Sequence, residues 1–122
     1  MNGEKAKGLK QMWIKRPYFE QIRSGQKTLE ARIGYPQMRR IRKGDIVLLR
    51  TGGRAENAMV IRIVDVREYR DFQEALKHED VNRLLPDTRP ENALEAYERI
   101  YPEWKVKQYG GVLVFELEVQ EK

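Results

Sequence analysis

The stretch from Gly25 to Ile33 constrains the fold more than any other part of this sequence. Gly25 follows a short amphipathic segment and is well placed to end a helix in a left-handed conformation. The next residues alternate between apolar and polar side chains, which is the period of a β-strand with two unlike faces. The apolar set is Leu29, Ala31 and Ile33, and the polar set is Thr28, Glu30 and Arg32. The polar set is typical of the solvated face of an antiparallel sheet, and it could equally line a binding site.

The rest of the chain predicts five strands and three helices in the order β-α-β-β-β-α-α-β. The expected strands are 12–15, 27–33, 46–49, 58–66 and 112–119, and the expected helices begin at Arg16, Asp71 and Thr88. Asp71 with Glu74, and Thr88 with Glu91, have the spacing of capping boxes. Parallel α/β domains alternate more regularly than this order. We therefore expect an α+β fold, a small mixed β-barrel with helices packed on its outside.

Composition limits the chemistry that this chain can carry. It has 122 residues, no Cys and one His, His78, which we interpret as a helix-end surface residue. The absence of Cys excludes a disulfide framework, a thiolate nucleophile and a Cys-based zinc site. No loop resembles an EF-hand, and we expect neither a metal nor a cofactor. The net charge of +5 favours an anionic partner, for which nucleic acid is the commonest choice, although simple solubility also explains it.

The N-terminal residues 1–11 are expected to form a flexible basic arm, and residues 12–122 a single domain. No apolar run approaches the ~20 residues of a membrane span. The first ten residues contain three Lys and lack the apolar core of a signal peptide. These features predict a cytoplasmic monomer without membrane contact.

The spacing of Gly25, Lys27, Glu30 and Arg32, written GxKxxExR, resembles the signature of the ASCH family, the activating signal cointegrator homology domains. The resemblance extends over about residues 12–119. It includes the Lys43-Gly44-Asp45 turn, the long strand after it, and a C-terminal helix that ends in Tyr-Pro. It implies a fold similar to the PUA domain, a β-barrel surrounded by helices. It also implies a cleft that is lined by the signature residues and receives RNA or a nucleotide.

One branch of the ASCH family consists of bacterial amidohydrolases that remove the acetyl group from N(4)-acetylcytidine. Their motif matches Gly25, Lys27 and Arg32, but they carry Thr where this chain has Glu30. They also use a Glu from a loop ahead of the last helix, for which the candidates here are Asp87 and Glu91. Other ASCH proteins have been linked to RNA cleavage. The resemblance therefore leaves an amidohydrolase or a ribonuclease open, with Lys27 and Glu30 as candidate catalytic residues.

Physical chemistry allows three roles for the motif. Lys27 lies in the expected turn, where its side chain could lean into a cleft. Desolvation would lower its pKa toward that of a base or nucleophile. A neighbouring Glu30 would instead keep it charged and suited to phosphate. Arg32 carries a planar fork that suits phosphate or could lock Glu30 in place. A structural ion network, a ligand site without catalysis, and a catalytic site all remain open.

Further candidates surround the motif in sequence. The basic cluster from Arg39 to Lys43 could form a funnel for a polyanion or a solvated charge run. Tyr109 and Trp104 alternate with lysines, so they could stack on a base or cap the end of the barrel. The expected ligand-binding set is Lys15, Arg16, Lys27, Glu30, Arg32, Arg39, Arg40, Arg42, Lys43 and Tyr109. We predict an RNA- or nucleotide-binding protein, with an amidohydrolase and a protein-interaction module as alternatives.

Overall fold

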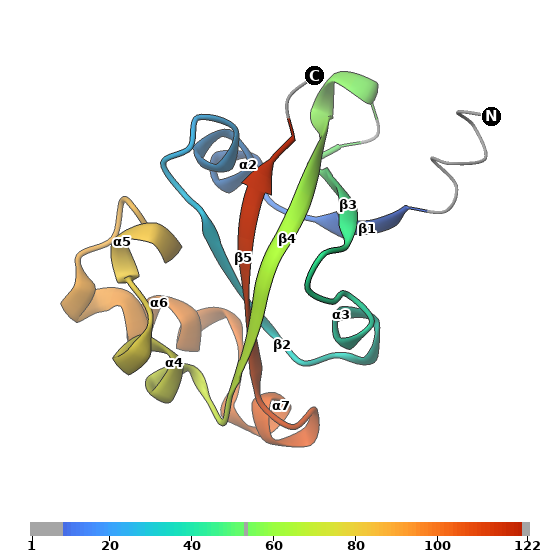
Figure 1. Cartoon of the computed structure of the whole chain (residues 1–122). Coiled ribbons are helices and arrows are strands. Elements are labelled where there is room, and N and C mark those ends of the chain that lie inside the picture. The colour runs from blue at the N-terminus through green and yellow to red at the C-terminus, as the bar shows by residue number, and fades with distance from the viewer. Residues whose placement is uncertain (1–8, 53, 121–122) are drawn as a thin grey trace.

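The computed structural model describes residues 9–120 except Gly53, and its centre is one mixed five-stranded sheet. The strands are β1 (Lys10–Trp13), β2 (Leu29–Ile33), β3 (Ile46–Arg50), β4 (Ala58–Tyr69) and β5 (Val112–Val119). Their order across the sheet is β1-β3-β4-β5-β2 (Figure 1). The β1–β3 pair is parallel, and the other three pairs are antiparallel.

The sheet curls into a half-barrel because its longest strand is irregular. The pairing of β4 with β5 shifts register between Ile63 and Asp65, and such bulges increase local twist and bend a strand. The predicted α+β class is confirmed. The curl stops short of a closed barrel, since β1 and β2 lie at opposite ends of the strand order.

Helices cover both sides of this sheet (Figure 1). They are α2 (Arg16–Arg23), α3 (Pro36–Arg39), α4 (Phe72–His78), α5 (Val81–Leu84), α6 (Ala93–Ile100) and α7 (Glu103–Gln108). Short 3-10 turns occupy Ala55–Asn57 and Pro90–Asn92. The sequence pattern missed α3, α5 and α7, which are only four to six residues long. Helices of one turn depend on tertiary contacts rather than on propensity, so they leave little periodicity to detect.

The two predicted capping boxes had different outcomes. The Glu74 backbone N–H donates to Asp71 Oδ1 at 2.8 Å, so the Asp71 cap is confirmed. Glu74 Oε1 accepts from the Arg70 N–H at 2.7 Å rather than from the N–H of Asp71, so the second bond of the box is displaced by one residue. The second prediction, at Thr88 and Glu91, is wrong. A 3-10 turn precedes α6, and no side chain caps either element.

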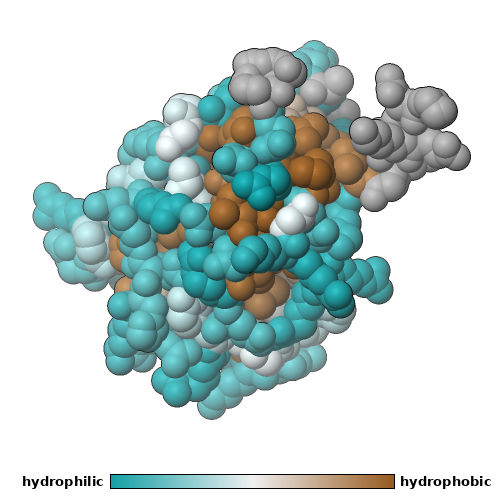
Figure 2. Space-filling view, viewed as in Figure 1, coloured by the Kyte–Doolittle hydropathy of each residue, from teal (hydrophilic) through white to brown (hydrophobic). Residues whose placement is uncertain are grey.

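Two apolar cores lie on opposite faces of the sheet, and β5 contributes to both. Leu113, Phe115 and Leu117 belong to the first core, which also includes Phe19 and Ile22 of α2. Val112 and Val114 belong to the second core, which also includes residues of β2, α4, α6 and α7. On the face seen in Figure 2, apolar residues gather over the middle and upper part of the sheet, whereas the lower part is mostly polar.

The expected arm falls mainly on residues 1–8, which lie outside the described residues. Lys10 and Gln11, which we assigned to this arm, belong to β1. No helix within residues 9–120, Gly53 apart, is long and apolar enough to cross a membrane.

Candidate functional site

The turn after α2 places Lys27 inside the molecule. Gly25 adopts φ +87°, a left-handed conformation that favours glycine. The Gly25 N–H donates to the Ile22 carbonyl at 3.1 Å, and the Lys27 N–H donates to the Gln21 carbonyl at 3.0 Å. These bonds satisfy the last carbonyls of α2 and reverse the chain, as predicted for a glycine-terminated helix. The reversal directs Lys27 into the core, where it is 1% exposed.

Lys27 is saturated by protein acceptors. Its Nζ donates to the Leu29 carbonyl at 2.7 Å and to the Leu84 carbonyl, and it lies 3.1 Å from Glu30 Oε1. An ammonium group has three donors, so each has a partner within the protein. We expected Lys27 to lean into an open cleft. Its ammonium group is instead buried, and it holds the carbonyls of Leu29 and Leu84 and the carboxylate of Glu30 in place.

Glu30 and Arg32 extend this contact into a triad. Arg32 Nε donates to Glu30 Oε2 at 2.5 Å, and Arg32 Nη2 donates to the Trp13 carbonyl at 2.7 Å. Glu30 is only 9% exposed, so the polar side of β2 is not the solvated face that the alternation also allowed. Burial alone would raise the pKa of the Glu30 carboxyl, but the charges of Lys27 and Arg32 hold it below its usual 4.5. The Glu30 carboxyl is thus ionised at neutral pH.

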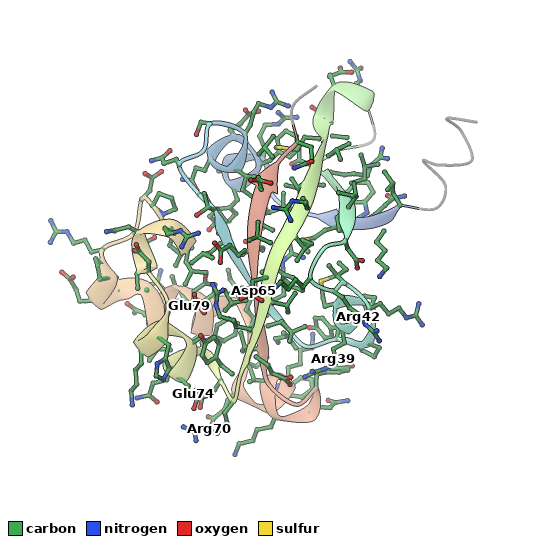
Figure 3. All side chains as sticks on the ribbon, in the orientation of Figure 1. Arg39, Arg42, Asp65, Arg70, Glu74 and Glu79 are labelled. Atoms are coloured by element: carbon green, nitrogen blue, oxygen red, sulfur yellow. The ribbon has the colours of Figure 1, made fainter. Side chains whose placement is uncertain are left out.

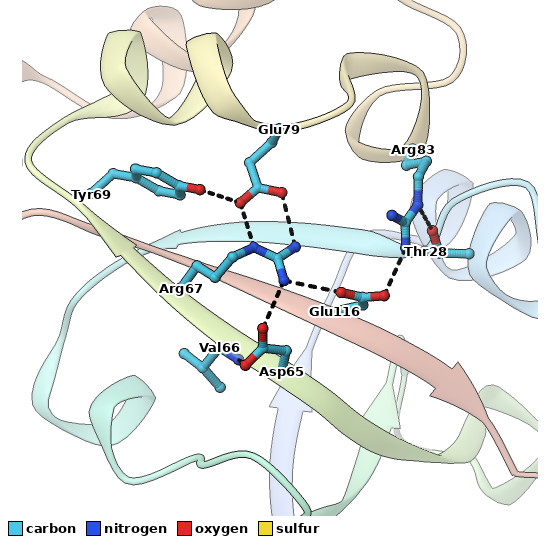
Figure 4. A network of polar contacts seen from close by, with 8 residues as sticks. All are labelled: Thr28, Asp65, Val66, Arg67, Tyr69, Glu79, Arg83 and Glu116. Carbon is cyan, nitrogen blue, oxygen red and sulfur yellow. Dashed lines mark hydrogen bonds and ion pairs between the residues drawn. The ribbon is translucent and has the colours of Figure 1, made fainter.

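The segment that covers Lys27 is α5, and a polar network holds it against the sheet (Figure 4). Arg83 Nε donates to Thr28 Oγ1 at 2.6 Å, and its Nη2 donates to Glu116 at 3.2 Å. Glu116 also accepts from Arg67, which forms two hydrogen bonds with Glu79 at 2.6 and 2.9 Å. This network connects β4, β5 and Thr28, the residue before β2, to α5, and it thereby fixes the Leu84 carbonyl over Lys27.

A pocket of about 60 Å³ opens beside the triad, between α2, β2 and α6. Its lining consists of Tyr18, Lys27, Glu30, Ala31, Leu85, Ala96, Tyr97, Ile100 and Tyr101. Three of these residues are tyrosines, and they stand near the charged groups. Arg32 is not part of the lining, but it adjoins the pocket through its bond with Glu30, which is. The arrangement combines charge and aromatic surface in one small recess.

Sequence reasoning missed the tyrosines of this pocket. The sequence pattern assigned Tyr97 and Tyr101 to the buried stripe of a helix, where Phe or Leu would serve as well. The available signal was the residue type, because two hydroxyls four residues apart on one helix face are more polar than a core requires.

The other candidate residues lie outside this pocket. Arg39 donates to the carbonyls of Gly34 and Tyr109 at 2.8 and 3.0 Å, so it joins α3 to the loop before β5. Tyr109 packs edge-on against Tyr35. Figure 3 shows Arg39 and Arg42 beside α3. The exposed members of the cluster are Arg40, Arg42 and Lys43, and none of the cluster lines the pocket.

Lys15 and Arg16 lie nearer to the triad in the chain. Lys15 is exposed at the start of α2, two residues after Trp13, whose carbonyl binds Arg32. Arg16 is also exposed, and it bonds Glu20 and Asn57.

Trp104 is 61% exposed, so the option that it caps the end of the barrel is wrong.

The candidate acids from the loop before the last helices do not reach Lys27. Asp87 accepts a hydrogen bond from Gln21 Nε2 at 2.8 Å, and Glu91 is exposed. In the part of the chain that the structure describes, no cluster of three His, Cys, Asp or Glu side chains could hold a metal.

The fold and the site define a class of small half-barrel domains. In this class a helix that ends at a glycine is followed by a turn and a strand, which together carry a Lys–Glu–Arg triad. The family model of the ASCH domain matches residues 12–121. The chain therefore belongs to the ASCH family.

Two solved structures share this fold. The crystal structure of hypothetical protein PH0355 is 29% identical with a TM-score of 0.78, and the match covers 90% of this chain and 97% of that one. The solution NMR structure of protein PF0455 from Pyrococcus furiosus is also 29% identical, with a TM-score of 0.71, covering 93% and 98% of the two chains. No curated protein matches the sequence.

Proposed function

We propose that this protein binds RNA or a nucleotide at the pocket between α2, β2 and α6. The observation that carries the proposal is the meeting of the Lys27–Glu30–Arg32 triad with a recess walled by tyrosines. Aromatic rings stack on unpaired bases, and an arginine fork beside them suits phosphates or base edges. The net charge of +5 supports an anionic partner.

The three motif residues take different roles in this proposal. Lys27 positions Glu30 and the Leu84 carbonyl, because its donors have no capacity left for a ligand. Arg32 is the direct contact. Its Nε and Nη2 bond Glu30 and Trp13, and its Nη1 has no hydrogen bond to the described residues. Lys15 and Arg16 supply further positive charge near the start of α2.

The basic cluster Arg39–Lys43 is proposed as a separate contact for the phosphate chain. Arg40, Arg42 and Lys43 are exposed, whereas Arg39 already bonds two carbonyls and Glu68. If Arg40, Arg42 and Lys43 each neutralise a phosphate, replacing them by Gln lowers the slope of log affinity against log salt by about 0.7 per residue for single strands.

Binding is favoured over catalysis by the state of Lys27. An amidohydrolase that used Lys27 as base or nucleophile would need a free amine, but this ammonium is buried against a carboxylate and two carbonyls. Incubation of the protein with N(4)-acetylcytidine should therefore yield no cytidine. Release of cytidine at a rate that depends on Lys27 would restore the enzymatic alternative.

The binding proposal is tested by fluorescence anisotropy with a labelled single-stranded RNA at one fixed, low salt concentration. Arg32→Ala should weaken binding by about tenfold or more, because it removes a direct contact. Arg62→Ala is the matched control, since Arg62 also pairs with a carboxylate, Glu118 at 3.0 Å, but neither member of this pair lines the pocket, whereas Glu30 does. Equal affinities for the two variants would contradict the assignment of the site. Absence of binding to any RNA would favour the protein-interaction module.

A further inference from the structure

The Tyr97 hydroxyl is an unusual group in this pocket. Tyr97 is 6% exposed, and its hydroxyl finds no hydrogen-bond partner among the described residues. Its ring stacks on Phe72 with centroids 4.6 Å apart, so the ring position is fixed by packing. Buried hydroxyls are normally hydrogen-bonded, and one without a partner needs an explanation. Phenylalanine would fill the same space without the free-energy cost of burying an unpaired hydroxyl. The Tyr97 oxygen is therefore a candidate for contact with a ligand.

The neighbourhood of the hydroxyl restricts the ligand that could satisfy it. Burial, and then the nearby Glu30 carboxylate, raise the pKa of Tyr97, so the hydroxyl stays protonated and can donate. Glu30 can only accept, and each of its oxygens keeps a second lone pair beyond the contacts with Lys27 and Arg32. The lining of the pocket therefore includes one donor and one acceptor, Tyr97 and Glu30.

Charge and hydrogen-bonding capacity together disfavour a cation, a phosphate or a carboxylate at the floor of the pocket. A cation would face Lys27 and Arg32, whose combined charge exceeds that of Glu30. A phosphate or carboxylate would be attracted by Lys27 and Arg32, but it would offer no donor to the remaining lone pairs of Glu30. A neutral group with an acceptor beside an N–H satisfies both Tyr97 and Glu30.

Shape restricts the ligand further. The recess holds about 60 Å³, well below the roughly 150 Å³ cavity that accommodates a benzene molecule. Only the edge of a flat ring can enter it, and the side chains of Tyr18 and Tyr101 provide aromatic walls. An acceptor next to an N–H on the edge of a flat ring is the hydrogen-bonding pattern of the Watson–Crick edge of a nucleobase.

We infer that the pocket reads the Watson–Crick edge of one unpaired base, with Tyr97 donating to its acceptor and Glu30 accepting from its N–H. This inference rests on the proposed RNA or nucleotide binding and adds to it that single strands are selected over duplexes, because pairing occupies that edge. Tyr97 is then a specificity-determining residue, whereas contacts with Arg32 and the basic residues are independent of the base.

The experiment compares wild type, Tyr97→Phe and Tyr35→Phe on three labelled probes of equal length: oligouridylate, an abasic ribose-phosphate oligomer, and an RNA duplex. Tyr35→Phe also removes a hydroxyl, but Tyr35 does not line the pocket. Wild type should bind oligouridylate about tenfold or more tightly than either other probe. Tyr97→Phe should lower the affinity for oligouridylate by roughly 3- to 10-fold and leave the affinities for the other two probes unchanged. Tyr35→Phe should match wild type.

A second readout separates ligand contact from a structural role. Because the Tyr97 hydroxyl is buried without a protein partner, Tyr97→Phe should raise the Tm of the free protein by roughly 3–6 °C. A lower Tm would show that the hydroxyl stabilises the fold, and it would overturn the inference. Equal wild-type binding of oligouridylate and the abasic oligomer, or equal oligouridylate affinities for wild type and Tyr97→Phe, would overturn it as well. If wild type bound none of the three probes, the proposed function itself would fail.

Discussion

Replacing Lys27 by Met should destabilise the protein strongly, although it removes one charge in a chain with 24 basic residues. The side chain is 1% exposed, so solvent does not screen its contact with Glu30. Loss of the ammonium leaves a buried carboxylate with Arg32 as its remaining cation. It also removes the charged donor to the carbonyls of Leu29 and Leu84. Methionine keeps most of the aliphatic stem, so packing changes little.

The size of this effect follows from the cost of breaking a buried ion pair. Removing one partner typically costs about 3–5 kcal/mol, because an uncompensated charge stays behind. Domains of this kind have a total stability of roughly 5–15 kcal/mol, so the variant should fold with a small margin. With a urea m-value of about 1–2 kcal/mol/M, the unfolding midpoint should fall by roughly 2 M or more.

Urea unfolding should be followed by circular dichroism, since Trp13 and Trp104 are both exposed and report poorly on the core by fluorescence. Lys43→Met is the matched control, because Lys43 is an exposed lysine in the loop before β3 and should change stability by less than about 0.5 kcal/mol. If Lys27→Met lay within about 1 kcal/mol of wild type, the triad would not be the structural centre of the site.

Two further predictions concern the groups around Lys27. Since the pKa of Glu30 lies below its usual 4.5 in the folded protein, its ionisation stabilises the fold above that value and the contribution is lost as the pH falls toward the folded pKa. Glu30→Gln should therefore lower stability at neutral pH, and its urea midpoint should approach that of wild type as the pH falls below 4.5. A difference in midpoint that does not change with pH would contradict an ionised Glu30. Arg83→Ala should cost about 1 kcal/mol, discounted for partial exposure, whereas Arg99→Ala, whose i,i+4 pair with Glu95 is exposed, should cost about 0.3 kcal/mol; equal losses would argue against α5 being held through Arg83.

The parts of the fold that were predicted correctly carry strong local signals. The strand 112–119 was predicted with the bounds that β5 has in the structure, because a β-branched and aromatic run follows two glycines. Gly25 and the Asp71 cap are equally local, since each acts on a backbone within a few residues. Long β4 was predicted three residues short, at the point where charged residues interrupt the apolar run.

The site was harder to predict because its cover comes from distant sequence. The carbonyl of Leu84 in α5, which receives Lys27, lies 57 residues further along the chain. No periodicity encodes that contact, and α5 itself is a single turn of four residues. The family resemblance directed attention to the signature residues, but it could not show that Lys27 is saturated by the protein. The interpretation of Tyr97 as a core residue is confirmed, but the helical pattern could not show that its hydroxyl lacks a partner among the described residues.

NMR titration of isotope-labelled protein with a short single-stranded RNA tests the location of the binding site most directly. The prediction is that the amide shifts concentrate on the pocket, at Ala31, Leu85, Ala96, Ile100 and Tyr101, while the amides of the core residues Val47 and Leu49 of β3 stay unchanged. The opposite result, with shifts confined to residues outside the pocket or absent at saturating RNA, would contradict the central claim that the triad and its tyrosine-lined recess form the binding site.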